Sequence, residues 1–239
     1  MQRELGAVID GWSQPERPGP AVMAGRFVRL ERLDGASHGA DLSQAFAGDA
    51  SLYDYLFSGP FATDAAFQRW IRDCAANPDF FYYAIRDLQS GLCSGMASYL
   101  RIDPAAGSIE VGSICFGPAL QRSPAATEAM FLMMQWAFDA GYRRYEWKCN
   151  ALNLPSRRAA ERFGFSYEGL FRQATVAKGR NRDTAWFAVI DKDWRALRTA
   201  YQTWLSPENF DEAGQQRQPL AALTAPVLET RDPVLQALV

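Results

Sequence analysis

The stretch Gln121-Arg-Ser-Pro-Ala-Ala-Thr-Glu-Ala129 lies where a strand-like segment gives way to a long helical pattern. It follows the alternating run 108–116 and opens an apolar helical pattern over 125–140. Ser123 has a side chain suited to capping a helix, and Pro124 is favoured as the first helical residue. The free N–H groups at such a helix start attract anions, phosphates above all. Taken alone, the stretch is explained more simply as a capped core helix.

The segments around this stretch alternate between strand and helix patterns. Strands are predicted at 25–33, 80–88, 92–102, 108–116, 143–150, 165–176 and 184–190. Helices are predicted at 37–47, 49–56, 64–77, 124–140, 155–163 and from 191 onward, with Asp64 and Asp191 as N-caps. The middle strands suit an antiparallel meander, and the later order adds βα crossovers. The pattern therefore predicts one α/β domain around a central mixed sheet.

The ends of the chain differ in composition from its middle. Residues 1–24 are rich in Gly and Pro and are interpreted as an irregular N-terminal arm, and the main domain is placed at 25–205. The tail at 206–239 carries apolar residues spread along its length, among them Phe210, Leu220 and Leu235. Such a tail is too apolar for a solvated linker, so we expect it to pack on the domain or on a partner.

Composition excludes several classes of function. The 239 residues carry a formal net charge of −2, which gives no general attraction to nucleic acid or anionic membranes. We see neither a signal-peptide core nor a membrane-spanning run, and expect a cytoplasmic protein without membrane or nucleic-acid partners. His38 is the single histidine, and the cysteines lack metal-ligand spacing, so we expect no metal site and no Ser-His-Asp triad. Cys74, Cys93, Cys115 and Cys149 are interpreted as buried, reduced thiols.

A second stretch, Asn153-Leu-Pro-Ser-Arg-Arg-Ala-Ala-Glu-Arg-Phe-Gly-Phe165, completes a set of three motifs. With it the sequence resembles the GNAT superfamily of N-acetyltransferases, most closely the branch that acetylates ribosomal-protein N-termini. The family's phosphate loop, Gln/Arg-x-x-Gly-x-Gly/Ala, is matched by Gln121 to Ala126, with Pro124 in place of its first glycine. The Asn-x-x-Ser and Gly-Phe motif is matched at Asn153, Ser156, Gly164 and Phe165, and a strand–turn–strand ending near a Trp is matched at 179–183 and Trp194.

The resemblance implies a central, mostly antiparallel sheet with helices on both faces (an α+β arrangement). It also implies direct acetyl transfer from acetyl-CoA to a primary amine, either a peptide or protein α-amino group or a small amine. The implied coenzyme-binding residues are Ile114, Cys115, Phe116, Gln121, Arg122, Ser123, Ala125, Ala126, Thr127, Asn153, Ser156 and Arg158. The first three lie on the strand that would offer an amide to the thioester oxyanion. Pro124 supplies no N–H, and we expect this missing donor to affect the affinity for the coenzyme more than the fold.

Three residues are the catalytic candidates. Ser156 is the candidate proton donor to the leaving thiolate, with Asn153 opening its helix, although both residues also suit a simple helix cap. Glu110 is the candidate base, because a carboxylate between Ile109 and Val111 is open to desolvation. Strand alternation leaves an outward-facing Glu110 equally open. Glu146 is a weaker second candidate.

Other assignments keep their alternatives. Arg157, Arg158 and Arg162 suit the coenzyme's ribose phosphate, but helix-surface arginines are more often solvated. Two other functions compete with catalysis. The protein would either bind acyl-CoA without catalysis or keep only the fold and serve as an interaction protein. The expected partners are acetyl-CoA and an amine acceptor, and a homodimer is compatible with the sequence.

Overall fold

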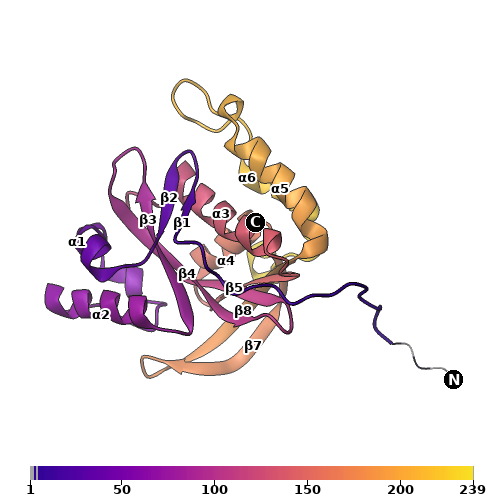
Figure 1. Ribbon diagram of the computed structural model, residues 1–239, viewed down its shortest axis with the longest axis horizontal. Helices are drawn as coiled ribbons and strands as arrows, with labels where there is room; N and C mark the ends of the chain where they lie inside the picture. Colours follow the sequence, from indigo (N-terminus) through magenta and orange to yellow (C-terminus); the bar gives the residue numbers. More distant parts are fainter. Residues whose placement is uncertain (1–2, 4, 239) are drawn as a thin grey trace.

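The computed structural model describes residue 3 and residues 5–238, and its centre is one eight-stranded sheet (Figure 1). The strands follow the order β1-β2-β3-β4-β5-β6-β8-β7. Their bounds are β1 Val22–Ala24, β2 Val28–Arg32, β3 Phe80–Asp87, β4 Cys93–Asp103, β5 Ser108–Phe116, β6 Arg144–Asn150, β7 Ser166–Ala177 and β8 Arg180–Ile190. Every neighbouring pair is antiparallel except β5 and β6, which run parallel. The predicted mixed, mostly antiparallel sheet is confirmed.

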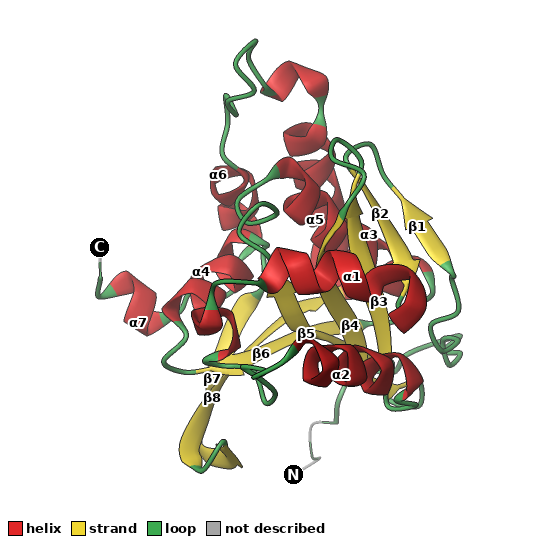
Figure 2. Ribbon diagram, turned by 90° about the vertical axis from the view of Figure 1, so that its left-hand side faces the viewer, coloured by secondary structure: helices red, strands yellow, loops and turns green. Residues whose placement is uncertain are grey.

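Helices cover both faces of this sheet (Figure 2). One face carries α1 (Gly35–Phe46) and α2 (Asp64–Ala76), and the other carries α3 (Pro124–Asp139), α4 (Leu154–Arg162) and α5 (Asp191–Leu205). The short elements are η1 Ala50–Tyr53, η2 Pro207–Asn209, α6 Leu220–Thr224, η3 Ala225–Val227 and α7 Pro233–Gln236. Strand alternation assigns side chains to the two faces: Tyr82 and Ala84 pack with the α1–α2 core, whereas Tyr83 and Ile85 pack with the α3 core.

Helix α3 begins where the sequence predicted. The Ser123 hydroxyl accepts a hydrogen bond from the Ala126 amide at 3.0 Å, and Pro124 is the first helical residue. Met130, Met133 and Met134 of α3 are almost fully buried in the hydrophobic core. Glu128 has a role that sequence periodicity does not reveal. Its carboxylate accepts from the amides of residues 26, 27 and 28 at 2.6–3.0 Å and so fastens the start of β2 to α3.

Some boundaries differ from the prediction. Thr63, not Asp64, caps α2, because its side chain accepts from the Ala66 amide. Asp191 is the first helical residue of α5 rather than its cap, and Asp193 accepts from the Ile190 amide at the helix start. Residues 22–24, which fall in the predicted arm, form β1, a three-residue edge strand too short to show a periodicity. None of the described helices is both long and apolar enough to cross a lipid bilayer.

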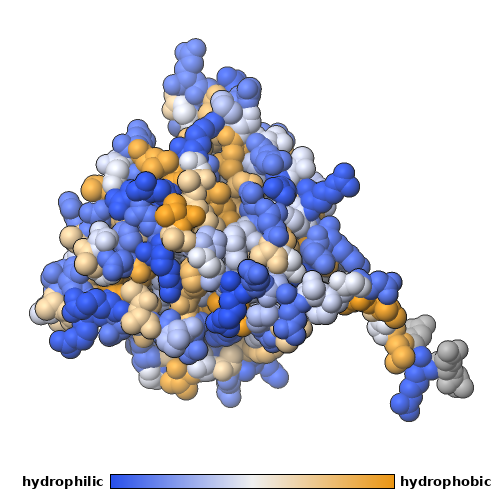
Figure 3. Space-filling view, viewed as in Figure 1, coloured by the Kyte–Doolittle hydropathy of each residue, from blue (hydrophilic) through white to orange (hydrophobic). Residues whose placement is uncertain are grey.

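The two ends of the chain behave differently. The N-terminal segment extends away from the body of the molecule (Figures 1 and 3), and Leu5 and Val8 are exposed. The tail returns to the body: Leu220 and Leu235 are buried, and α6 contacts α4 and α5. A buried ion pair joins Asp232 of the tail to Arg157 of α4, with a distance of 2.6 Å from Arg157 Nε to Asp232 Oδ2. These contacts are made within a single chain.

Candidate active site

The sheet opens between β5 and β6. Their parallel pairing covers only 108–111 against 144–147, after which the two strands separate. On its other side β5 carries a bulge, because Ser98 pairs with Gly112 and Met96 with Cys115. Ser113 within the bulge has a left-handed φ of 50°. Beyond Val111, β5 has no strand partner on the β6 side, so its backbone polar groups there are not used by the sheet.

One large cleft occupies this opening and has a volume of about 1640 Å³. It is lined from both faces of the sheet, by the loop after α1 and by α3, α4 and the tail. Of the predicted site residues, the lining includes Glu110, Ile114, Cys115, Phe116, Gln121, Arg122, Ala126, Thr127, Asn153, Ser156 and Arg158. The cleft does not reach Ser123 or Ala125, although Pro124 between them lines it. Residues distant in sequence are thus brought to one site.

The loop before α3 offers fewer free amides than the motif implies. The amides of Ser123, Ala126 and Thr127 already donate to Leu120 O, Ser123 Oγ and Ser123 O, at 3.3, 3.0 and 3.3 Å. The amides of Arg122 and Ala125 have no acceptor among the described residues. Arg122 adopts a left-handed φ of 59°, the conformation that glycine takes at such turns. Two amides and the Arg122 guanidinium therefore remain for an anion.

Two further arginines line the cleft beyond this loop. Arg158 is exposed, and Arg162 is partly buried, donating to the Thr127 hydroxyl at 3.2 Å. Neither forms an ion pair with any residue that the structure describes. Burial lowers the pKa of Arg162, as desolvation of an unpaired cation does. Arg157 is different: its guanidinium is committed to Asp232 and to the Ala151 carbonyl, so it is not available to a phosphate.

Helix α4 holds the second motif. The Asn153 side chain accepts from the Ser156 amide at 3.1 Å, which confirms Asn153 as the N-cap. The Ser156 hydroxyl accepts from the indole N–H of Trp147 at 3.1 Å. Trp147 is buried in β6 where that strand leaves β5. Because the indole can only donate, the Ser156 hydroxyl keeps its own hydrogen, which it can donate to the neighbouring Cys149 sulfur or into the cleft.

Glu110 and Glu146 lie opposite each other in the parallel register of β5 and β6. Their neighbours Val111 and Trp147 pack with the α3 core, so both carboxylates lie on the α1–α2 face. Lys148 Nζ lies 2.8 Å from Glu110 Oε2 and 2.6 Å from Glu146 Oε2. This ammonium allows two adjacent carboxylates to coexist.

The surroundings of the two carboxylates differ. Burial raises the pKa of Glu110 and outweighs the attraction of Lys148 and of Arg101, whose guanidinium lies 2.7 Å from Glu110 Oε1. Burial also acts on Glu146, but hydrogen bonds from Lys148 and Arg144 outweigh it and lower the pKa. Two carboxyl groups with pKa values shifted apart mark Glu110 as the one suited to accept a proton. Glu110 is also the one that lines the cleft.

The wall of the cleft that faces Glu110 was not predicted from the sequence. Lys148 lies over the Trp186 ring at 3.8 Å, and Trp186 stacks on Phe171 of β7 with 4.3 Å between ring centroids. Arg182, on β8 like Trp186, is 9% exposed, and its guanidinium lies 4.7 Å from the centre of the Phe57 ring. The sequence placed Arg182 in a turn at 179–183, whereas β8 already begins at Arg180. The alternation of Arg182, Thr184 and Trp186 along a strand was the available signal.

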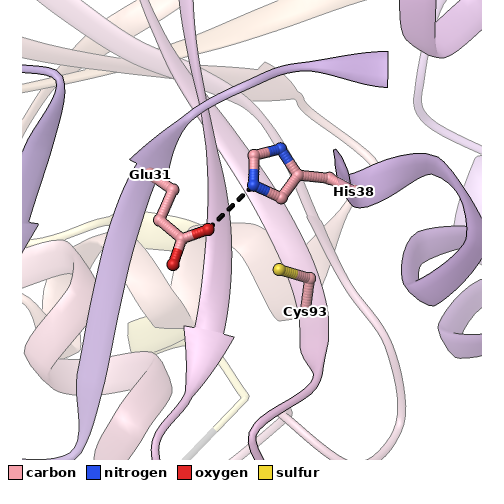
Figure 4. Close-up of side chains that lie close together, drawn as sticks. All are labelled: Glu31, His38 and Cys93. Carbon is pink, nitrogen blue, oxygen red and sulfur yellow. Dashed lines mark hydrogen bonds and ion pairs between the residues drawn. The ribbon is translucent and has the colours of Figure 1, made fainter. Parts of the chain in front are cut away.

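A polar cluster outside the cleft, Glu31, His38 and Cys93, has its donor atoms close together (Figure 4). His38 Nδ1 accepts from the Asp34 amide at 3.0 Å, so Nε2 carries the proton that reaches Glu31 Oε2 at 2.8 Å. Arg86 also contacts Glu31, and its hydrogen bond lowers the pKa of that carboxyl to about 2. Burial raises the pKa of Cys93 to about 11. With a protonated imidazole nitrogen and a filled carboxylate, the cluster fits a structural ion network better than a metal site.

Comparison with known proteins agrees with this architecture. Residues 28–166 match the family model described as "Acetyltransferase (GNAT) domain". A GCN5-related N-acetyltransferase from Brucella melitensis is 50% identical, with a TM-score of 0.88, over 91% of this chain and 100% of that one. A protein described as one of the "probable acetyltransferases (GNAT family)" from Chromobacterium violaceum ATCC 12472 is 41% identical, with a TM-score of 0.77, over 81% and 98%.

The fold is that of an acetyltransferase, and the chain belongs to the GNAT acetyltransferase family. Members of this family transfer an acetyl group from acetyl-CoA to an acceptor. An acetyltransferase from Salmonella typhimurium that modifies the N-terminal serine of a 50S ribosomal subunit protein is 20% identical over 70% of this chain and 96% of that one, with a TM-score of 0.60. That likeness shows the fold alone. Among curated proteins, no sequence matches the chain significantly.

Proposed function

We propose that this protein is an acetyl-CoA-dependent N-acetyltransferase that acetylates a primary amine by direct transfer. The observation that carries the proposal is the arrangement of the cleft, which joins a cationic end to a buried carboxylate through the gap between β5 and β6. The cationic end suits a phosphorylated coenzyme, and the carboxylate suits removal of a proton from an amine. The bulged strand between them suits a thioester.

The phosphates would bind where the α3 start leaves donors without acceptors. The Arg122 and Ala125 amides supply two hydrogen bonds, and the guanidinium groups of Arg122, Arg158 and Arg162 supply charge. Ile114, Cys115 and Phe116 line the cleft beyond the bulge, where a backbone amide can face the thioester oxygen. Gln121 donates its side-chain amide to the Phe116 carbonyl at 2.9 Å and so links the loop to β5.

The reaction exchanges a C–S bond for a C–N bond. The amine nitrogen attacks the thioester carbon, and the amine proton passes to Glu110 directly or through water. The carbon–sulfur bond then breaks, and the departing thiolate takes the Ser156 hydroxyl proton, which solvent returns to Ser156 while Glu110 releases the amine proton to solvent. Trp147 positions the Ser156 hydroxyl through its indole N–H, and Asn153 positions the first turn of α4. Ser123 has a structural role, because its hydroxyl caps the start of α3.

Two measurements test the proposal. Acetyl-CoA should stabilise the fold by about 2–3 kcal/mol at a hundredfold excess over its Kd, because it binds the folded state only. Thiol release from acetyl-CoA should then require an added primary amine, and mass spectrometry of the product should show an added acetyl group. A melting temperature unchanged by millimolar acetyl-CoA would refute coenzyme binding. Binding without thiol release across a panel of amines would favour the non-catalytic acyl-CoA-binding alternative.

A further inference from the structure

Strand β8 presents Arg182, Thr184 and Trp186 to the cleft on the α1–α2 face. The position of Arg182 follows from the sheet register: β6 pairs with β8 only up to Thr184, so Arg182 projects just past the end of β6. Contact with Phe57, in the loop before α2, places the guanidinium at the α1–α2 side of the cleft. The phosphate-binding arginines of α4 lie on the other face.

Arg182 is the unusual charge of this wall. It is 9% exposed, yet its side chain forms no hydrogen bond or ion pair with any described residue, and its Nε is buried without a partner. A buried guanidinium is normally paired, because leaving a desolvated charge alone is costly. The Phe57 ring offers stacking but no acceptor atom.

Two other buried cations near the cleft, Lys148 and Arg157, have carboxylate partners. Lys148 is shared by Glu110 and Glu146, and Arg157 pairs with Asp232. Burial lowers the pKa of Arg182. The pKa of Arg157 is instead raised, because Arg157 forms hydrogen bonds with Asp232. Glu110 exerts some attraction on Arg182 but lies beyond ion-pair distance. Among residues 3 and 5–238, none supplies the counter-charge of Arg182 within ion-pair distance.

A second donor lies on the same face of β8. The indole N–H of Trp186 is buried and has no acceptor among the residues described. A forked cation without a partner matches an anionic group with two oxygens, and a carboxylate fits that pattern in charge and planarity. Both donors lie on the wall that faces Glu110, the proposed base.

We propose that the acceptor is an amine that also carries a carboxylate, and that Arg182 binds this carboxylate while the amine faces Glu110. The proposal rests on the proposed N-acetyltransferase function and narrows its acceptor class. A free amino acid and a peptide with an acidic residue beside its N-terminus share this chemistry. Binding of the carboxylate would fill the partner position of Arg182 and hold the amine at the thioester.

Matched acceptors test the proposal. Thiol release from acetyl-CoA is measured with two pairs of acceptors that differ by one carboxylate. The first pair is L-serine and L-serinamide, and the second is the C-terminally amidated dipeptides Ser-Asp and Ser-Asn. Rates are expressed per concentration of unprotonated amine, because amidation of an amino acid also changes the basicity of its amine. We expect the carboxylate member of at least one pair to have the higher kcat/KM by roughly 10- to 100-fold, the range of a charge-assisted hydrogen bond. The pair that shows the difference identifies the source of the carboxylate.

Substitution of the arginine links the preference to its side chain. Arg182→Gln should remove the difference within the pair by raising KM for the carboxylate acceptor, with little change for the neutral one and unchanged binding of acetyl-CoA. Arg182→Lys should restore part of it. Arg180→Gln, an exposed arginine on the same strand, is the matched control and should keep the preference. Melting temperatures of all variants verify that each protein is folded.

The outcomes separate the two proposals. Equal kcat/KM for both members of each pair, or a preference that survives Arg182→Gln, would overturn the acceptor inference while leaving the enzyme an N-acetyltransferase. No thiol release with any amine would overturn the proposed function itself, and the acceptor inference with it.

Discussion

At the scale of single residues, the shift in the pKa of Glu110 predicts a pH profile. Glu110 accepts a proton only when ionised, so the rate rises with pH through its pKa, which burial raises above the ordinary glutamate value. Glu110→Gln should therefore lower kcat/KM by roughly 10²- to 10⁴-fold at neutral pH. The loss should shrink at high pH, where free amine is already abundant. Steady-state rates from pH 5 to pH 10 would measure this.

Glu146 is the matched control for that experiment, because it faces the same side of the sheet and shares Lys148 with Glu110. Hydrogen bonds from Lys148 and Arg144 lower its pKa despite burial, so it is a poor proton acceptor at neutral pH. Glu146→Gln should keep the shape of the profile. A profile that changes with Glu146→Gln and not with Glu110→Gln would assign the base to Glu146.

Substitutions of Ser156 and Trp147 should impair stabilisation of the leaving thiolate to different degrees. Ser156→Ala removes the proposed donor and should lower kcat by roughly 10- to 1000-fold, with acetyl-CoA binding nearly intact. Trp147→Phe keeps the donor and removes the 3.1 Å hydrogen bond that orients it, so its effect should be smaller. Pre-steady-state thiol release measures the effect of each substitution on the chemical step. A titration of each variant with acetyl-CoA measures its effect on coenzyme binding. Full activity in Ser156→Ala would reduce Ser156 to a residue of the helix cap.

At the scale of elements, the start of α3 predicts the effect of the unusual proline. Pro124 lines the cleft and has no N–H, whereas the neighbouring amides of Arg122 and Ala125 have no acceptor among the described residues. Pro124→Gly adds a third donor and should leave acetyl-CoA affinity unchanged or raise it. Isothermal titration calorimetry measures the Kd. A Kd raised tenfold or more, about 1.4 kcal/mol, would mean that the rigid proline itself orders the loop.

The elements themselves were largely predictable, because most of their signals are local. Ser123, Asn153 and the apolar periodicity of α3 determine where helices begin, and capping chemistry reads directly from sequence. The facing of Glu110 was not predictable, since alternation defines two faces without saying which one lines a cleft. Arg182 and Trp186 were missed for the same reason. Their importance depends on β6, β7 and the loop at Phe57 meeting in space.

At the scale of the whole molecule, the cleft depends on contacts that join distant parts of the chain. Trp204, Phe210 and Gln216 line its cationic end beside Arg162, so the segment after α5 forms part of the site. The Arg157–Asp232 pair holds the tail to α4, the helix that also carries Ser156. We therefore expect the tail to support both stability and the geometry of α4.

Asp232→Ala tests this coupling. Asp232 is fully buried and Arg157 is 3% exposed, so the substitution leaves an arginine charge in the interior without its carboxylate. Breaking such a pair typically costs about 3–5 kcal/mol of unfolding free energy, because the remaining charge is desolvated and unpaired. Urea unfolding measures the loss, and Arg231→Ala, an exposed neighbour, should change it by less than about 0.5 kcal/mol. Because α4 also presents Ser156, kcat should fall in Asp232→Ala under conditions where the variant is still folded. Stability and kcat both equal to those of Arg231→Ala would mean that the tail packs against α4 without supporting it.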